Sequence, residues 1–146
     1  MLIWDQPEVI NTWIAQRGGG FCYPGSYTAL GWETDGKLVA GMTFYSSNGR
    51  NCYLCLAIDK GLFPIGLLKA GLFYAFSQLK LQRLTLTVES DNLASQNLVR
   101  RLGASLEATL RDAGKSGDML IYSLRPENCA IWSKLNGQGR KRTDGT

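Results

Sequence analysis

The sequence predicts a mixed α/β (α+β) domain, with a central twisted sheet that is mostly antiparallel, contains one parallel strand pair and carries helices on its faces. The first observation is the block at residues 59–103, where a loop is followed by an apolar helix, a strand and a second helix. The second is a set of three strand-like segments before this block, joined by tight turns. A helical crossover carries the chain back to the end of the sheet where the preceding strand began. The strands before and after the block's first helix should therefore be parallel neighbours.

The elements before the block are predicted from stripes and turns. Asp5 and Pro7 favour a helix start, Gly18–Gly20 favours its end, and the apolar stripe between them comprises Val9, Ile10, Trp13 and Ile14. Strands are predicted at Tyr27–Thr34 and Lys37–Tyr45, separated by Asp35–Gly36, a pair typical of type I′ hairpins. Asn48 and Gly49 mark the next turn, before a third strand at Asn51–Ile58.

The block itself begins with Pro64, which can open a helix because the first turn needs no amide donor there. The predicted apolar stripe of this helix comprises Leu67, Leu68, Leu72, Phe73, Phe76 and Leu79. From Arg83 to Val88 apolar and polar residues alternate, which indicates a strand with one buried face. Asp91 is the predicted N-cap of the second helix and Gly103 its end, and two further strands, around Leu106–Leu110 and at Asp118–Leu124, follow.

The 146-residue length and 45% hydrophobic content fit a single domain, expected at residues 1–135. Residues 136–146 are polar and aperiodic and are expected to form a disordered basic tail. The net charge of +4 comes mostly from Lys134 and this tail, so the body is nearly neutral, which argues against a broad nucleic-acid surface. The start lacks a signal pattern and no apolar run has the length of a membrane span, so a cytoplasmic protein is expected.

The four cysteines and the absence of histidine limit the chemistry. Cys52 and Cys55 form a CxxC motif, but residues three apart on a strand point to opposite faces, and no histidine could complete a metal site. We therefore expect buried or half-buried thiols and no metal. Without histidine, Ser-His and Cys-His nucleophiles are excluded, so any reaction must use carboxylates, hydroxyls, thiols or backbone groups.

The segment VESDNLASQNLVRRLGASLEATLRDAG, followed by GDMLIYSL, resembles the GNAT superfamily of acyl-CoA-dependent N-acyltransferases. The resemblance is nearest to the branch with ribosomal-protein N-terminal acetyltransferases and small phage-encoded relatives. The matching positions are Asn92, Ser95, Leu98, Leu102, Gly103, Glu107 and Arg111. The resemblance implies transfer of an acetyl group from acetyl-CoA to a primary amine, carried by a small molecule or by a protein N-terminus or lysine.

The resemblance also implies where acetyl-CoA would bind. In this family the strand before the central helix splays from its parallel neighbour, and the amides near Leu56, Ala57 and Ile58 would hold the acetyl carbonyl. The pyrophosphate would bind the loop and first helical turn, with contacts from Lys60, Gly61, Phe63, Ile65, Gly66 and Leu67. Asn92 would hold the pantetheine arm or, alternatively, sit beside the Asp91 cap. The loop, KGLFPIG, departs from the glycine-rich family pattern, and an ordinary helix start explains it equally without a ligand.

The residues proposed for the reaction are carboxylates and one hydroxyl. Glu89 is the first candidate for the base because it ends a central strand, and open α/β sheets place ligands at the carboxyl ends of strands. Glu107 and Asp59 follow. The family's usual tyrosine acid corresponds to Val99, whereas Ser95 matches the hydroxyl position one turn earlier. Each of these side chains could instead be an ordinary solvated group.

Two other functions remain compatible with the sequence. The altered phosphate loop and the missing tyrosine favour a GNAT-like module that binds without catalysing, for example in a phage particle. The RKR run in the tail favours, more weakly, an acyltransferase that acts on nucleic acid. Apolar sheet edges make a homodimer plausible. Acceptor choice is expected to depend mainly on the N-terminal helix, the FCYPG loop and the AGKSG hairpin, but none of them encodes the amine in a readable motif.

Overall fold

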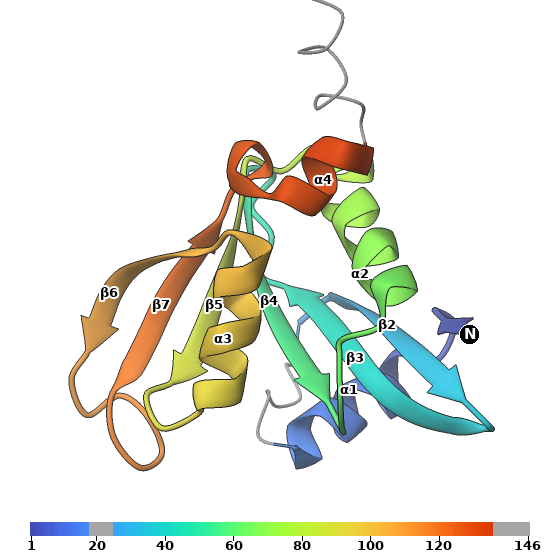
Figure 1. Cartoon of the computed structure of the whole chain (residues 1–146), viewed down its shortest axis with the longest axis horizontal. Coiled ribbons are helices and arrows are strands. Elements are labelled where there is room, and N and C mark those ends of the chain that lie inside the picture. The colour runs from blue at the N-terminus through green and yellow to red at the C-terminus, as the bar shows by residue number, and fades with distance from the viewer. Residues whose placement is uncertain (18–24, 136–146) are drawn as a thin grey trace, which may run out of the picture.

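The computed structural model describes residues 1–17 and 25–135. In these residues seven strands form one sheet with the order β1-β2-β3-β4-β5-β7-β6, in which β4–β5 is the parallel pair (Figure 1). The predicted fold class is therefore confirmed. The strands are β1 (Leu2–Ile3), β2 (Tyr27–Thr34), β3 (Lys37–Tyr45), β4 (Asn51–Ile58), β5 (Arg83–Glu89), β6 (Ser105–Leu110) and β7 (Met119–Leu124). The helices are α1 (Pro7–Gln16), α2 (Ile65–Leu72), the π-helix η1 (Phe73–Gln78), α3 (Leu93–Leu102), the 3₁₀ turn η2 (Pro126–Asn128) and α4 (Ala130–Leu135).

The meander β2-β3-β4 has the predicted turns. Asp35 and Gly36 both have positive φ, 52° and 77°, as a type I′ hairpin requires. At the next turn the Asn48 side chain accepts the backbone N–H groups of Arg50 and Asn51 at 3.0 and 2.9 Å. The short strand β1, which pairs with Gly31 and Trp32 of β2, was not predicted, because two residues are too few to show a period.

The parallel pair separates soon after it forms. Residues Asn51–Tyr53 of β4 pair with Arg83–Thr85 of β5, and the pairing stops there. Beyond this point β4 stays on β3 as far as Ile58, and β5 stays on β7 as far as Glu89. The sheet thus opens between β4 and β5, and the two strands diverge in Figure 1.

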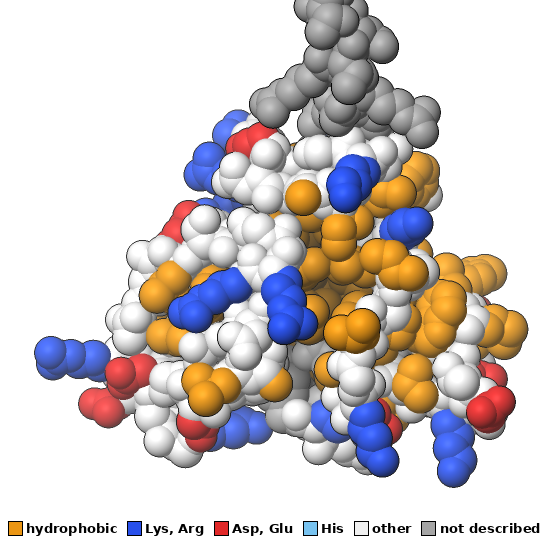
Figure 2. All heavy atoms as spheres, in the orientation of Figure 1, with side chains coloured by type: hydrophobic (Ala, Val, Ile, Leu, Met, Phe, Trp, Pro, Cys, Tyr) orange, Lys and Arg blue, Asp and Glu red, His pale blue; other side chains and the backbone are white. Residues whose placement is uncertain are grey.

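Helices cover the two faces of the sheet unequally. Helix α1 packs on one face, where Ile10 and Ile14 are fully buried against small residues of the first strands. Helices α2, α3 and α4 pack on the other face around the larger core (Figure 1), and Figure 2 shows hydrophobic side chains gathered between α3 and α2 on this face. Cys52 belongs to this larger core and Cys55 to the core under α1, so the two thiols do point to opposite faces, and both are buried as predicted.

The helix after Pro64 differs from its prediction. It changes into the π-helix η1 after Leu72, as the i→i+5 bond from Leu79 N–H to the Tyr74 carbonyl (2.9 Å) shows. A π turn rotates the following side chains away from the regular helical stripe. Leu79, which follows this turn and was predicted to be buried, is consequently 36% exposed. Phe73 was also predicted to be buried, but it is 51% exposed although its N–H still reaches the Lys69 carbonyl as in an α-helix, and Phe76 is buried as predicted.

The second helix of the block is capped by Asn92, which corrects the prediction of Asp91. The Asn92 amide oxygen accepts the Ser95 backbone N–H at 3.1 Å, whereas Asp91 accepts the Ser116 hydroxyl at 2.8 Å. Gly103 ends the helix with φ 104°, as predicted. Helix α4 and turn η2 were not predicted.

Some predictions fall on residues that the structure does not describe: the Gly18–Gly20 helix end, most of the FCYPG loop, Cys22 and the tail at 136–146. In the described ranges, every helix is too short or too polar to cross a membrane.

Candidate active site

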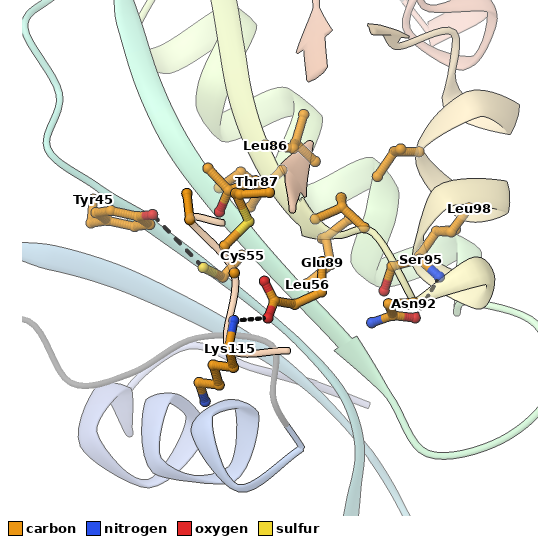
Figure 3. A pocket seen from close by; sticks show the side chains of 16 residues that line it. Tyr45, Cys55, Leu56, Leu86, Thr87, Glu89, Asn92, Ser95, Leu98 and Lys115 are labelled. Atoms are coloured by element: carbon orange, nitrogen blue, oxygen red, sulfur yellow. Dashed lines mark hydrogen bonds between the residues drawn. The ribbon is translucent and has the colours of Figure 1, made fainter. Parts of the chain in front are cut away.

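A pocket of about 300 Å³ occupies the opening between β4 and β5 (Figure 3). Its walls come from the diverging strands, from the first turns of α3 and from the loop between β6 and β7. The lining residues are Tyr45, Leu54, Cys55, Leu56, Leu86, Thr87, Val88, Glu89, Asn92, Ser95, Leu98, Val99, Ala113, Gly114, Lys115 and Met119. Most of these side chains are apolar, so the few polar groups among them are the ones that can direct chemistry.

The backbone of β4 presents free polar groups to this pocket. The Asp59 N–H donates to the Val39 carbonyl at 2.9 Å, which fixes the hydrogen-bonded positions of the β3–β4 ladder. Because such ladders alternate, Ala57 bonds to β3, while the N–H and C=O of Leu56 and Ile58 point towards β5. Since β5 has already diverged, Leu56 offers an amide donor at the pocket wall, and Ala57, a predicted carbonyl-binding position, does not.

Glu89 is the one carboxylate among the described lining residues, and its two oxygens differ. Oε1 accepts the backbone N–H of Lys115, as Figure 3 shows. Oε2 is buried and has no hydrogen-bond partner. A buried, unpaired carboxylate oxygen is costly for a fold, so a binding partner for it is expected from a ligand.

Helix α3 brings Asn92 and Ser95 to the pocket from its first turn (Figure 3). Asn92 uses its amide oxygen to cap the helix, which leaves its NH₂ group available for other contacts. The Ser95 side chain lies on the pocket wall, one turn before Val99. Val99, which is 2% exposed, contributes a methyl surface and no acid group.

The start of α2 flanks the opening but does not line the pocket. The Pro64 carbonyl accepts the N–H of Leu68 at 3.0 Å, and no side chain caps the helix, so the amides of Ile65, Gly66 and Leu67 have no intrahelical acceptor. Such a turn favours an anion through its free amides and its dipole. Lys60 and Gly61 are exposed beside it, and Phe63 is half-buried against the core.

Comparison with known proteins agrees with this geometry. No family model matches the sequence, and no curated protein matches it. Solved structures do match: spermidine N-acetyltransferase SpeG of Vibrio cholerae has a TM-score of 0.68 at 14% identity, over 94% of this chain and 99% of that chain. A GNAT-family acetyltransferase of Bacillus anthracis has a TM-score of 0.55 at 18% identity, over 69% and 66%. Mycobacterium smegmatis RimJ, solved with CoA-disulfide, has a TM-score of 0.59 at 22% identity, over 80% and 62%.

The chain has the GNAT fold. The predicted resemblance is therefore confirmed at the level of the fold, including the parallel pair that splays.

Two predicted carboxylates lie outside the pocket of this GNAT fold. Glu107, on the edge strand β6, forms an ion pair with Arg83 at 2.9 Å. The pKa of Glu107 is lowered mainly by the hydrogen bond from Arg83 and next by one from Ser123. Glu107 is therefore a member of a surface ion pair. Asp59 pairs with Arg17 at 2.9 Å, in a separate groove beside α1.

Several lining residues of the GNAT pocket were missed from sequence. Tyr45 and Cys55 lie on adjacent strands with their hydroxyl and thiol 4.0 Å apart, and the wall at residues 113–115 belongs to the AGKSG turn. This turn was predicted to be a hairpin that affects the choice of acceptor, but it was not predicted to lie against Glu89. Its position against Glu89 depends on contacts across about 25 residues, which no local pattern records.

Proposed function

We propose that the protein is an N-acetyltransferase that moves an acetyl group from acetyl-CoA to a primary amine. The observation that carries the proposal is the opening between β4 and β5, where the Leu56 amide and the unpaired Glu89 Oε2 meet in one pocket. Such a pair supplies both a donor for a developing oxyanion and an acceptor for the proton of an attacking amine.

In the proposed reaction the chain's own groups act in sequence. Glu89 accepts a proton from the acceptor ammonium, directly or through water, and the neutral amine attacks the thioester carbonyl carbon. The N–H of Leu56 holds the carbonyl oxygen as its charge grows. The C–S bond then breaks and the new C–N bond remains. The departing thiolate takes a proton from Ser95 or from water, and the nitrogen of the new amide gives up its extra proton to that same hydroxyl or water.

The free backbone groups of the diverging strands suit the rest of acetyl-CoA. The pantetheine arm is extended and carries amides, so it can bond to Leu56 and Thr87 as a partial extra strand. The NH₂ of Asn92 lies beside the same path. The first turn of α2, with the amides of Ile65, Gly66 and Leu67, would hold the pyrophosphate, and Lys60 adds positive charge.

Thermal unfolding with acetyl-CoA, CoA, ATP or no ligand tests binding first. A ligand at about 100 times its Kd stabilises by roughly 2.7 kcal/mol, which raises Tm by several degrees. We expect a shift with acetyl-CoA and CoA but not with ATP. Ser95→Phe should fill the pocket and abolish the shift, whereas Asn97→Phe, a matched change on the exposed side of α3, should keep it. No shift with wild type would contradict the proposal.

Turnover is then tested with radiolabelled acetyl-CoA and a panel of polyamines, amino acids and peptides. Glu89→Gln is expected to lower kcat by about 10²-fold, within the usual range for loss of a general base. Ser95→Ala should lower it less, because water can replace the hydroxyl. Unchanged turnover in both variants would remove Glu89 and Ser95 from the mechanism.

A GNAT-like module that binds without catalysis is the second candidate. Pro64 lacks an amide donor at the phosphate loop, and Val99 supplies no acid, which favours this function. Binding of CoA without turnover of any amine would support it.

Acylation of nucleic acid stays a prediction, since the tail lies outside the described residues. Deletion of residues 137–146 should make such an activity weaker and less salt-sensitive. Cytoplasmic location and a homodimer likewise stay predictions.

A further inference from the structure

The loop at residues 112–118, between β6 and β7, is hydrogen-bonded to each of the residues 89–91 at the end of β5. The Lys115 N–H donates to Glu89 Oε1, and the Asp118 N–H donates to the Ser90 hydroxyl at 3.1 Å. Ser90 N–H donates in turn to the Asp118 carbonyl at 3.0 Å, and the Ser116 hydroxyl donates to Asp91 at 2.8 Å. Three consecutive residues of β5 and its extension are therefore each held by the same loop.

This attachment fixes which oxygen of Glu89 meets the pocket. Because Lys115 N–H occupies Oε1, the carboxylate cannot rotate freely, and Oε2 is left without a partner (Figure 3). Gly114 is needed for the same arrangement. A Cβ added there would lie 2.6 Å from Oε2 and 2.9 Å from the carbonyl oxygens of Gly117 and Asp118.

The loop is itself well ordered by internal bonds. Gly114 N–H donates to the Gly117 carbonyl at 2.8 Å, and Asp112 N–H donates to the Asp118 side chain at 3.0 Å. A closed turn of this kind can hold a donor at a constant position, which is what a fixed carboxylate requires.

We propose that the 112–118 loop is a positioning element for Glu89, with Lys115 N–H and Gly114 as its positioning groups. The loop binds Oε1 and directs Oε2 at the acceptor amine. This inference rests on the proposed acetyl transfer, because it assigns Glu89 the role of base. If the loop only joined β6 to β7, substitutions in it would change the stability of the fold but not kcat.

A double-mutant cycle separates these two roles. Lys115→Pro removes the N–H, while Lys115→Ala loses the same side chain and keeps the N–H. We expect kcat of Lys115→Pro to be at least about tenfold below that of Lys115→Ala, with KM for acetyl-CoA within about threefold. In the Glu89→Gln background, where the base is already lost, the same pair should differ by less than about threefold. Equal losses in both backgrounds, or no loss in either, would overturn the proposal.

Gly114→Ala is the second variant, should Lys115→Pro fail to fold. It retains the N–H of residue 115 but places a methyl group against Oε2. Its kcat should fall in wild type by about tenfold, and in Glu89→Gln by less than about threefold. Equal losses would count against positioning here as well.

Hydrogen exchange of the Lys115 amide makes the test independent of turnover. The amide should be protected in wild type and should exchange at least about tenfold faster in Glu89→Ala, which removes its acceptor. If wild type turns over no amine, the proposed function fails, and the exchange result alone decides whether the loop holds Glu89. An amide that exchanges equally fast in wild type and Glu89→Ala overturns the positioning proposal whatever the activity.

Discussion

Gly66→Ala tests whether a glycine at the start of α2 serves phosphate binding or packing. The family resemblance assigned Gly66 to the phosphate loop, where glycine lets backbone approach phosphate. In the structure a Cβ at Gly66 would lie 2.6 and 2.7 Å from two ring carbons of Trp32. The glycine is thus explained by the indole that packs on it.

The expected magnitude follows from two opposing terms. Overpacking against Trp32 costs about 1–3 kcal/mol, and replacing a helical glycine by alanine gains roughly 0.5–1 kcal/mol. Gly66→Ala should therefore destabilise by about 0.5–2 kcal/mol, which lowers Tm by about 2–6 °C for a domain of this size. In a Trp32→Leu background the clash is relieved, so the same change should raise Tm by about 2–3 °C.

Thermal unfolding by circular dichroism of the four proteins in this cycle measures the coupling. Equal destabilisation by Gly66→Ala in both backgrounds would refute the packing explanation. The acetyl-CoA Kd then decides the phosphate role. Because alanine keeps the amide, Kd of the double variant should stay within about threefold of Trp32→Leu. A stable double variant that had lost binding would show that phosphate needs the glycine after all.

Three further changes have distinct expected outcomes. Asn92→Ala should cost about 1 kcal/mol by removing the cap on the Ser95 amide, and more than Asp91→Ala; equal Tm losses would contradict the cap assignment. Burial raises the pKa of Cys52 from 9.0 to about 11, so its contribution to stability is present below pH 9 and is lost as pH rises towards 11. The stability advantage of wild type over Cys52→Ala, measured by urea unfolding, should accordingly shrink by about 2–3 kcal/mol between pH 8 and pH 11, and a constant difference would argue against it. Tyr122→Phe should leave Tm unchanged or raise it, because the fully buried hydroxyl has no partner among the described residues; a fall of several degrees would reveal one.

The elements of the fold could be predicted because their signals are local. The alternation around Arg83–Val88, the Asp35–Gly36 turn and the Gly103 helix end depend on neighbouring residues alone. The predicted stripe failed at Leu79 because the π turn before it shifts the side chain out of the α-helical period. Local periodicity therefore identifies an element but not a change of pitch within it.

The site was only partly predictable. Glu89 was found because it ends a central strand, and Ser95 because it matches a hydroxyl position of the family; the structure brings both to one pocket. Glu107 matched the family pattern but lies on an edge strand, paired with Arg83. The sequence could not show that Asp91 accepts the distant Ser116 hydroxyl while Asn92 caps α3.

The opening between β4 and β5 needs support where the strands part. Thr85, on the last paired rung, donates to the side chain of Asn51, on the first rung, at 2.6 Å, and Arg83 donates to the Thr85 hydroxyl at 3.0 Å. Arg83 also reaches Glu107 of β6, so one polar network joins three strands at the point of divergence. These bonds keep the parallel pair closed below the pocket.

At the other end of the opening, α3 is bonded to the end of β5. Its Gln96 side chain, only 7% exposed, donates to the backbone carbonyl of Ser90 at 3.0 Å, just after β5 ends. The backbone between these two fixed ends cannot pair across the gap, and each unsatisfied buried group costs about 1–3 kcal/mol. An extended substrate chain with amides would satisfy those groups. A fold with this opening therefore gains more from an amide-bearing ligand than a closed sheet would, which is the physical reason to expect acetyl-CoA there.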